Sequence, residues 1–231
     1  MIKAVFFDLY NTLVRYEPPR EEIEAKVLHD FGIDVSAAAL RRPMQIADEF
    51  IYNEIARRPL SARSREEKTA LYAQYQEMLL KEAGVKFDKK LVLTLLGRMQ
   101  QAGTDLVLFD DVKPALDALK ERGLILGLIS NIEQDMTDTI DRLGLRSRLG
   151  IVVTSLEAGS NKPKPEIFQY ALRQAGLRPA EAVYVGDQYQ VDIVGARGAG
   201  MKGILLDRTG SHENITDCPR IQGLAEVVEH L

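Results

Sequence analysis

The sequence predicts an α/β fold, in which a doubly wound, Rossmann-like parallel sheet carries an inserted all-helical domain. Short apolar runs end in small or polar residues, a pattern typical of strands buried on both faces of a parallel sheet. Helical patterns lie between these runs, and such alternation of strands and helices indicates a doubly wound sheet. Of the 17 glycines, only three fall within residues 1–102. Glycine-poor sequence of this kind favours long helices, whereas the glycine-rich remainder favours short strands and tight turns.

Five strands are predicted along the chain. The first is Ala4–Phe7, an apolar run that ends at Asp8. The others are 124–129 before Ser130, 151–153 before Thr154, 182–185 before Gly186, and 203–206 before Asp207. Each run is nearly continuous in apolar residues, so we expect both faces of the sheet to be covered by helices.

Helices are expected between the later strands, where apolar residues recur on one face and a glycine follows. The three faces are Val112, Leu116 and Leu119 before Gly123; Ile132, Met136, Ile140 and Leu143 before Gly144; and Ile167, Ala171 and Leu172 before Gly176. The second helix is expected to begin near Ile132, where Ser130 would cap it. The third is expected to begin at Pro165.

Residues 15–102 follow a different pattern, rich in long-helix formers. Pro18 and Pro19 precede an Arg/Glu-rich helix that ends near Gly32, and further helical stretches cover about 36–57, 64–83 and 88–101. We therefore predict a core domain of residues 1–14 and 103–231, interrupted by a helical cap domain of about four helices at residues 15–102.

Composition excludes several classes of protein. The chain has 231 residues, 30 Lys+Arg and 34 Asp+Glu, and the net charge of −4 lacks the basic excess of a nucleic-acid binder. Its apolar runs are far shorter than the roughly 20 residues of a membrane span. The single cysteine, Cys218, excludes a disulfide framework and a cysteine-based zinc site. No secretory signal is recognisable, so we expect a cytoplasmic protein. The sequence does not indicate an oligomeric state.

Polar residues gather where the predicted strands end, which is the edge where open α/β sheets bind ligands. They combine carboxylates, hydroxyl groups, an amide and a lysine: Asp8, Tyr10, Thr12, Ser130, Asn131, Lys162, Asp187 and Asp192. Phosphoryl transfer requires such a set, namely a nucleophile, donors to the phosphoryl oxygens, and acids that hold a divalent cation.

Four segments containing these residues resemble, in order, the four motifs of the haloacid dehalogenase (HAD) superfamily. They are VFFDLYNTL at 5–13, GLISN at 127–131, GSNKPKPEIF at 159–168 and VGDQYQVDIVGA at 185–196. Each segment alone is a weak signal, but four in order, each after a predicted strand, are specific. The resemblance covers nearly the whole predicted core, and it is closest to members with a helical cap inserted after the first motif.

The resemblance implies that Asp8 is a nucleophile that forms a covalent aspartyl intermediate. It implies that Ser130 and Asn131 bind the transferring group, and that Lys162 holds both that group and the nucleophile. We expect Thr12 to support Asp8 by a hydrogen bond at the same phosphate-binding site.

A magnesium site is implied by the same resemblance. Its ligands would be the carboxylates of Asp8, Asp187 and Asp192 and the main-chain carbonyl of Tyr10. Carboxylate and carbonyl oxygens are the hard ligands that Mg²⁺ prefers.

Tyr10 departs from the phosphatase pattern, in which an Asp acts as general acid at this position. The 2-haloacid dehalogenases of the family carry Tyr there, because a halide leaves without a proton. Those dehalogenases typically lack the metal-binding acid of the fourth motif, and this chain retains it. A cluster of acids is unfavourable without a cation, so we favour a Mg²⁺-dependent phosphatase of a small phosphorylated metabolite over a 2-haloacid dehalogenase. A third hypothesis is a non-enzymatic member that binds a phosphorylated ligand or a partner.

Two further patterns lie outside the catalytic set. Gly195, Gly198 and Gly200 lie inside an expected helix, so they do not form a dinucleotide-binding fingerprint. The cap arginines are expected to be solvated helix charges, although one of them could reach a substrate anion: Arg41, Arg42, Arg57, Arg58, Arg63 and Arg65.

Overall fold

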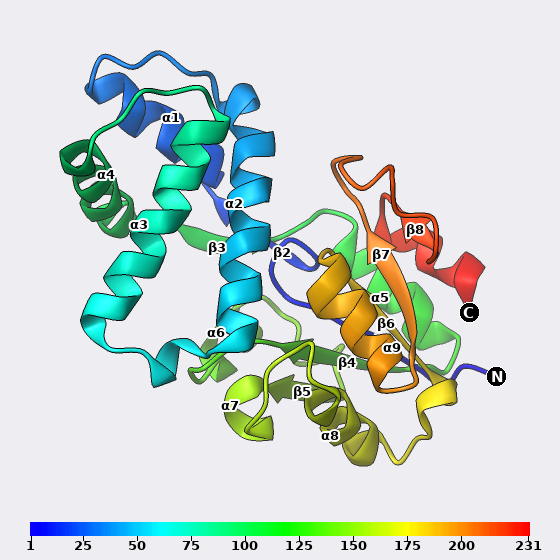
Figure 1. Ribbon diagram of the computed structural model, residues 1–231. Helices are drawn as coiled ribbons and strands as arrows, with labels where there is room; N and C mark the ends of the chain where they lie inside the picture. The colour runs from blue at the N-terminus through cyan, green and yellow to red at the C-terminus, as the bar shows by residue number, and fades with distance from the viewer. The chain divides into compact units, whose positions relative to one another are not determined.

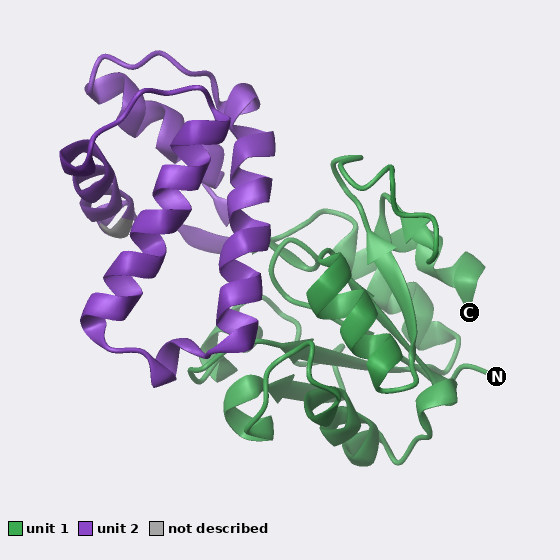
Figure 2. Ribbon diagram, in the orientation of Figure 1, with its two compact units in different colours: residues 1–15, 107–231 green, residues 16–106 purple. Residues whose placement is uncertain are grey.

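The computed structural model describes residues 1–99 and 101–231, and it divides into two compact units (Figure 2). Unit 1 comprises residues 1–15 and 107–231, and unit 2 comprises residues 16–106. The chain passes between the units through two short strands, β2 (Val14–Glu17) and β3 (Asp105–Leu108), which pair as a two-stranded sheet. Neither strand was predicted, because four-residue runs of mixed polarity carry little signal.

A six-stranded parallel sheet forms the centre of unit 1 (Figure 1). Its strands, in spatial order, are β5 (Ile151–Thr154), β4 (Ile125–Ser130), β1 (Ala4–Phe7), β6 (Ala182–Gly186), β7 (Lys202–Leu206) and β8 (Arg220–Ile221). The five predicted strands are confirmed to within one residue at each end. The sixth, β8, was missed because it has only two residues.

Burial explains the central place of β1, whose four residues are all fully buried. Phe6 lies in register with Gly127 of β4 on one side and with Tyr184 of β6 on the other. A Cβ atom at Gly127 would collide with the Phe6 ring. Glycine therefore makes room for a large aromatic side chain at the centre of the sheet.

The helices of unit 1 are α5 (Val112–Glu121), α6 (Thr137–Arg142), α7 (Ser155–Ala158), α8 (Pro165–Ala175) and α9 (Gly195–Gly198). Short 3₁₀ segments lie at Pro179–Glu181 and Leu224–His230, and a π-helix lies at Tyr189–Val194. The predicted inner faces of α5 and α8 are buried. Gly123 and Gly176 follow these helices with φ of +77° and +66°, the left-handed conformation that glycine adopts without strain.

The helix expected from Ile132 begins instead at Thr137, and Ser130 does not cap it. Tertiary hydrogen bonds hold the preceding segment out of helical geometry. The Ile132 carbonyl accepts from the main-chain N–H of Leu156 and from the Ser155 hydroxyl, so it is engaged outside any helix. Gly200 likewise lies beyond the end of α9, with φ of +82°, rather than inside a helix.

Unit 2 consists of four α-helices and one short 3₁₀ turn, Leu60–Ala62, within the described residues. The helices are α1 (Arg20–Asp30), α2 (Ala37–Arg57), α3 (Arg65–Glu82) and α4 (Lys89–Gln101), close to the predicted ranges. Ser36, Ser64 and Asp88 accept hydrogen bonds from the first turns of α2, α3 and α4. Buried leucines hold the bundle together: Leu28, Leu40, Leu79, Leu80 and Leu95.

Polar side chains also lie inside unit 2. Arg20 of α1 binds Asp48 of α2 with both guanidinium NH₂ groups, one at 3.0 Å. Gln76 of α3 donates a hydrogen bond to the buried carboxyl group of Glu24. Burial raises the pKa of Glu24, although Gln76 and Arg20 act in the opposite direction.

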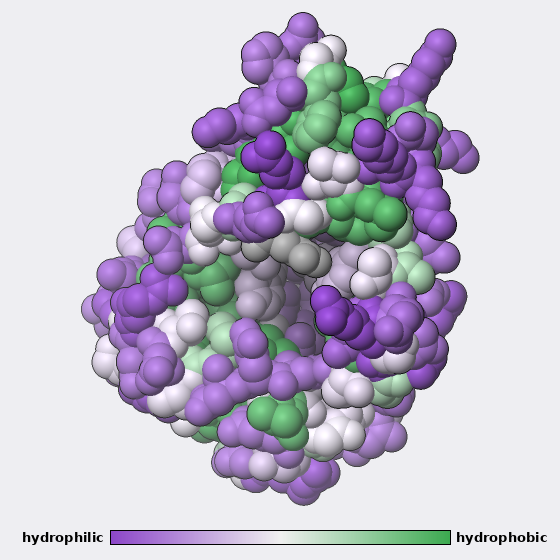
Figure 3. All heavy atoms as spheres, turned by 90° about the vertical axis from the view of Figure 1, so that its left-hand side faces the viewer, coloured by the Kyte–Doolittle hydropathy of each residue, from purple (hydrophilic) through white to green (hydrophobic). Residues whose placement is uncertain are grey.

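Hydrophilic residues cover most of the face drawn in Figure 3, with hydrophobic residues in smaller separate areas. Four of the cap arginines are paired within unit 2: Arg41 with Glu21, Arg57 with Glu54, Arg58 with Glu67, and Arg63 with Glu54. No helix in the described residues combines the length and apolar character that crossing a bilayer requires.

Candidate active site

The strand order brings together residues that are far apart in the sequence. Asp8 directly follows β1, Ser130 ends β4, and Asp187 directly follows β6. Because β4, β1 and β6 are adjacent and parallel, their carboxyl ends lie at one edge of the sheet. Lys162 joins them from the loop before α8, and Asp192 from the π-helix after β6.

Asp8 is buried, and one of its two carboxylate oxygens takes both of its hydrogen bonds. Ser130 Oγ and Lys162 Nζ each donate to Oδ1 at 2.8 Å. Both side-chain donors therefore fix the carboxylate through the same oxygen, Oδ1.

The Lys162 ammonium lies against three acceptors. Its Nζ is 2.8 Å from Asp8 Oδ1, 2.6 Å from Asp192 Oδ1 and 2.7 Å from the Tyr184 hydroxyl. Burial alone would lower the pKa of Lys162, but the charges of Asp192 and Asp8 outweigh it and raise the pKa. Lys162 is therefore a cation, and the predicted contact with Asp8 is present in the structure.

The main chain of Lys162 is held by Asn131. The Lys162 N–H donates to Asn131 Oδ1 at 2.7 Å, and Asn131 Nδ2 donates to the Lys162 carbonyl at 3.0 Å. This two-way contact joins the end of β4 to the lysine loop. A role for Asn131 in binding phosphate directly stays a prediction.

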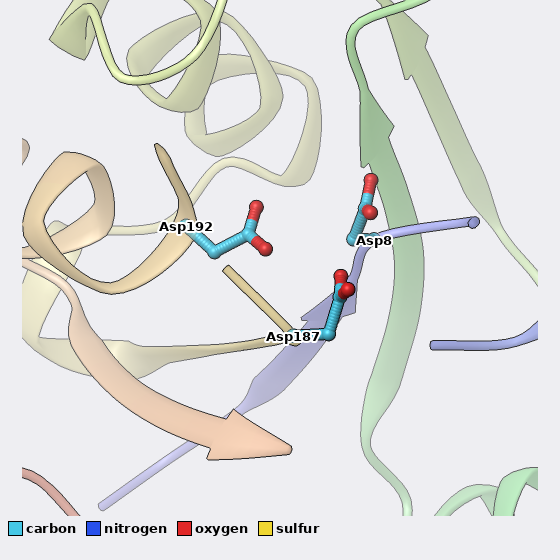
Figure 4. Close-up of side chains that lie close together, drawn as sticks. All are labelled: Asp8, Asp187 and Asp192. Atoms are coloured by element: carbon cyan, nitrogen blue, oxygen red, sulfur yellow. The ribbon is translucent and has the colours of Figure 1, made fainter. Parts of the chain in front are cut away.

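Three carboxylates converge beside this lysine (Figure 4). Each of Asp8, Asp187 and Asp192 offers an oxygen, and these oxygens lie within 4.8 Å of one another. Asp187 Oδ1 is buried, with no hydrogen-bond partner among the described residues. Burial and the charges of Asp192 and Asp8 raise the pKa of Asp187 well above its ordinary value.

The donors at this cluster fit a small divalent cation. Three carboxylates face a single ammonium, so negative charge is in excess, and hard oxygen ligands of this type are those Mg²⁺ takes. No group among the described residues donates to Asp187 Oδ1, so this oxygen is open to a ligand.

A glycine makes the cluster sterically possible. A Cβ atom at Gly186 would collide with the Asp192 carboxyl group. The same carboxyl group is anchored by Oδ2, which accepts the Gln188 main-chain N–H at 2.9 Å. Gly186 thus lets the Asp192 carboxyl group approach the main chain closely, and the next residue, Asp187, contributes its own carboxylate to the cluster.

Thr12 differs from expectation, whereas the role of Tyr10 stays a prediction. The Thr12 hydroxyl is buried and has no hydrogen-bond partner among the described residues, so the expected bond to Asp8 is wrong. The main chain turns back after Asp8, where the N–H groups of Leu13 and Val14 both donate to the Leu9 carbonyl. Tyr10 is partly buried in this loop, where it forms a β-bridge with Val14. Metal ligation by the Tyr10 carbonyl stays a prediction.

Arg208, which was not predicted as a site residue, binds the loop that follows Asp8. Arg208, which follows β7, binds Asp111 with two hydrogen bonds of 2.9 and 3.0 Å and donates to the Thr12 carbonyl at 3.0 Å. Its guanidinium lies 4.0 Å from the centre of the Phe109 ring. Its position just beyond a predicted strand end was the signal that could have identified Arg208.

Tyr184 was also missed. It is fully buried in β6, and its hydroxyl contacts Lys162, Asp192 and the Ile129 carbonyl. The available signal was a single polar atom within the otherwise apolar strand AVYVG, two residues before Gly186. A buried tyrosine hydroxyl needs a partner, and here the partners belong to the site.

Comparison with known proteins identifies the family of this chain. A family model described as haloacid dehalogenase-like hydrolase matches residues 2–200. A glyceraldehyde 3-phosphate phosphatase of Methanopyrus kandleri is 32% identical over 93% of this chain and 88% of its own length. Haloacid dehalogenase-like hydrolase domain-containing protein 3 of Homo sapiens is 31% identical over 89% of this chain and 82% of its own.

Among solved structures, a 2-haloacid dehalogenase of Pseudomonas syringae pv. Tomato DC3000 superposes with a TM-score of 0.57. It is 26% identical, and the match covers 99% of this chain and 97% of that one. The sheet order, the four motifs at one edge and the family model lead to one conclusion: the chain belongs to the haloacid dehalogenase-like hydrolases.

Proposed function

We propose that this protein is a Mg²⁺-dependent phosphatase that acts on a small phosphorylated metabolite through Asp8. The carrying observation is a buried nucleophile candidate that contacts a cation and lies beside two further carboxylates. Lys162 and Ser130 both bind Asp8, Lys162 also binds Asp192, and Asp187 brings the cluster to three carboxylates. A relative named as a phosphatase of glyceraldehyde 3-phosphate supports a small phosphorylated substrate.

The first chemical step follows from the hydrogen bonds at Asp8. Since Ser130 and Lys162 both donate to Oδ1, Oδ2 is the oxygen available to attack phosphorus. A P–O bond to Asp8 forms as the P–O bond to the substrate breaks, and the electron pair leaves with the substrate oxygen. Water then attacks the aspartyl phosphate, which releases inorganic phosphate and restores the carboxylate.

Asp8, Asp187 and Asp192 would hold the metal ion. When bound, Mg²⁺ offsets the repulsion between a phosphate dianion and the carboxylates and orients the phosphoryl oxygens. Lys162 contributes a second, permanent positive charge, and its three contacts fix where that charge lies. The chain's own task is to hold these groups in place, because phosphoryl transfer depends mainly on positioning and electrostatics.

The test is a screen of small phosphorylated metabolites and 2-haloacids, each with Mg²⁺ and with a chelator. Release of inorganic phosphate that requires Mg²⁺ is the expected result. Phosphate release that is undiminished in chelator would remove the metal from the proposal. Release of halide without any phosphatase activity would replace the proposal with a dehalogenase.

The dehalogenase is a second candidate because of Tyr10 and the likeness to a solved 2-haloacid dehalogenase. A tyrosine, with an ordinary pKa near 10, is a weaker acid than aspartic acid toward the leaving oxygen, and it is a poor base for activating water. If the protein is a phosphatase, acyl and aryl phosphates should therefore react faster than alkyl phosphates. Tyr10→Asp should raise alkyl-phosphate hydrolysis, which a rate series over leaving-group pKa measures. A fast, flat series in the unmodified protein would show that another group donates the proton.

A further inference from the structure

We propose that Tyr184 is a positioning residue, which holds the Lys162 ammonium against Asp8 and thereby couples three strands of the sheet at the reacting carboxylate. Nothing in the motif resemblance assigns this residue a role. The inference rests on the proposed function, since Lys162 matters to catalysis only if Asp8 is the nucleophile.

The first step of the argument is the number of donors on Lys162. An ammonium group has three N–H donors and no acceptor. The three acceptors within 2.8 Å are Asp8 Oδ1, Asp192 Oδ1 and the Tyr184 hydroxyl. Two of these carry charge, and Tyr184 is the uncharged third. Without it, one N–H of a fully buried cation would have no partner.

The orientation of the Tyr184 hydroxyl is set by its own donor. The hydroxyl oxygen lies 2.8 Å from the Ile129 carbonyl oxygen and 3.3 Å from Asp192 Oδ1, so the hydroxyl donates its hydrogen to Ile129. Donation to Ile129 leaves the oxygen lone pairs facing Lys162. The neighbouring residue, Ser130, donates to Asp8. A closed ring of contacts therefore runs from Asp8 to Lys162, Tyr184 and the Ile129 carbonyl by hydrogen bonds, along the main chain to Ser130, and by a hydrogen bond back to Asp8.

Packing holds the Tyr184 side chain in place within these contacts. The side chain is fully buried, and its aromatic ring packs edge-to-face on Phe168 with centroids 5.2 Å apart and an interplanar angle of 85°. Tyr184 also lies in register with Phe6 of β1, so the side chains of Tyr184 and Phe6 lie on the same face of the sheet. Phe6 precedes Asp8 by two residues. The hydroxyl is thus fixed by the strand that pairs with the nucleophile's own strand.

The main test is Tyr184→Phe, which removes one oxygen atom and keeps the aromatic packing. We expect kcat to fall by about 10- to 100-fold, the scale of a misplaced catalytic group, with KM changed by less than about threefold. Tyr170→Phe is the matched control, because Tyr170 of α8 packs against the same apolar cluster and its hydroxyl lies outside the ring of contacts. Equal kcat in Tyr184→Phe and Tyr170→Phe would overturn the proposal.

A second readout separates positioning from simple packing and does not depend on activity. In protein labelled with ¹⁵N-lysine, a buried ammonium held by three acceptors should give one slowly exchanging NH₃⁺ signal, which Lys162→Met identifies by its loss. Tyr184→Phe should broaden or abolish that signal, and Tyr170→Phe should leave it unchanged. Absence of a protected signal in the unmodified protein overturns the ring even if Tyr184→Phe does not fold. A persistent signal with no phosphatase activity in any screen would refute the proposed function and leave the hydrogen-bonded ring standing.

Discussion

Each unit of this protein buries a cluster of charged side chains, and the two clusters differ in their balance of charge. In unit 2, Arg20 pairs with Asp48, and the carboxyl group of Glu24 is met by the amide of Gln76. In unit 1, one ammonium faces three carboxylates, and one carboxylate oxygen has no hydrogen-bond partner among the described residues.

The comparison shows that burial of charge alone does not identify a functional site. The unit 2 cluster satisfies itself, as structural ion pairs do, and nothing in it calls for a ligand. The unit 1 cluster keeps an excess of negative charge that burial makes unfavourable, and an imbalance of this kind marks a candidate functional site. Four substitutions test the contrast, from the largest expected effect to the smallest.

Asp8→Asn should abolish the activity and preserve the fold. Loss of a covalent nucleophile is expected to lower kcat by at least about 10³-fold. The unfolding transition in urea should remain cooperative, because the amide fits the same space. Steady-state phosphate release and circular dichroism measure the two effects. A folded variant with unchanged turnover would remove Asp8 from the mechanism.

Asp48→Asn should have the opposite effect to Asp8→Asn: it should lower the stability of the fold and preserve the activity. Breaking a largely buried pair leaves Arg20 uncompensated, and we expect the free energy of unfolding to fall by about 2–4 kcal/mol, below the full cost at a completely buried site because Arg20 is partly exposed. Urea titration measures this loss. Asp34→Asn, at an exposed pair with His29 in the same unit, is the control and should leave the midpoint unchanged. Equal midpoints for both variants would contradict the structural role of the Arg20–Asp48 pair.

Asp187→Asn tests whether the excess negative charge of the unit 1 cluster serves to bind Mg²⁺. In the unmodified protein, Mg²⁺ at 100 times its Kd should add about 2.7 kcal/mol to the free energy of unfolding, by linkage. The variant should lose most of this gain while being at least as stable as the unmodified protein without metal, because a repelled carboxylate is gone. Thermal melts with Mg²⁺ and with chelator test both parts. An undiminished Mg²⁺ shift in Asp187→Asn would place the metal elsewhere.

Glu24→Gln should produce the smallest effect, and that effect should depend on pH. Burial raises the pKa of Glu24 in the folded state, so the folded protein binds this proton more tightly than the unfolded chain does. The resulting stability is present below the unfolded pKa and is lost as pH rises through the folded pKa. Glutamine keeps the acceptor for Gln76 and cannot ionise. The variant should therefore match the unmodified protein near pH 4 and exceed it in stability at neutral pH, as urea midpoints across that range will measure. A constant difference at all pH values would contradict the assignment.

The sequence was sufficient for the strands of the core and for the family, because buried parallel strands and strand-end motifs are local patterns. It failed at residues 131–136, where bonds to Ser155 and Leu156, distant in the sequence, replace helical bonds. It also failed at Thr12 and Tyr184. Which hydroxyl meets which partner depends on strand order and on the backbone path after Asp8, and neither is encoded in a local pattern.

The sheet order has a consequence for how the chain must fold. β1 lies at the centre, and its Ala4 pairs with Ile125 and with Ala182, partners separated from it by much of the chain. The whole of unit 2 is synthesised between β1 and its first partner. Its helices make mostly sequence-local contacts, which form fast, whereas the pairing of β1 must close long loops. At a ribosomal rate of about 5–20 residues per second, many seconds pass between the synthesis of β1 and the synthesis of its partner β6. The strand that presents Asp8 is thus the first strand of the sheet to be synthesised, and its pairing is completed only after the helices of unit 2 have been synthesised.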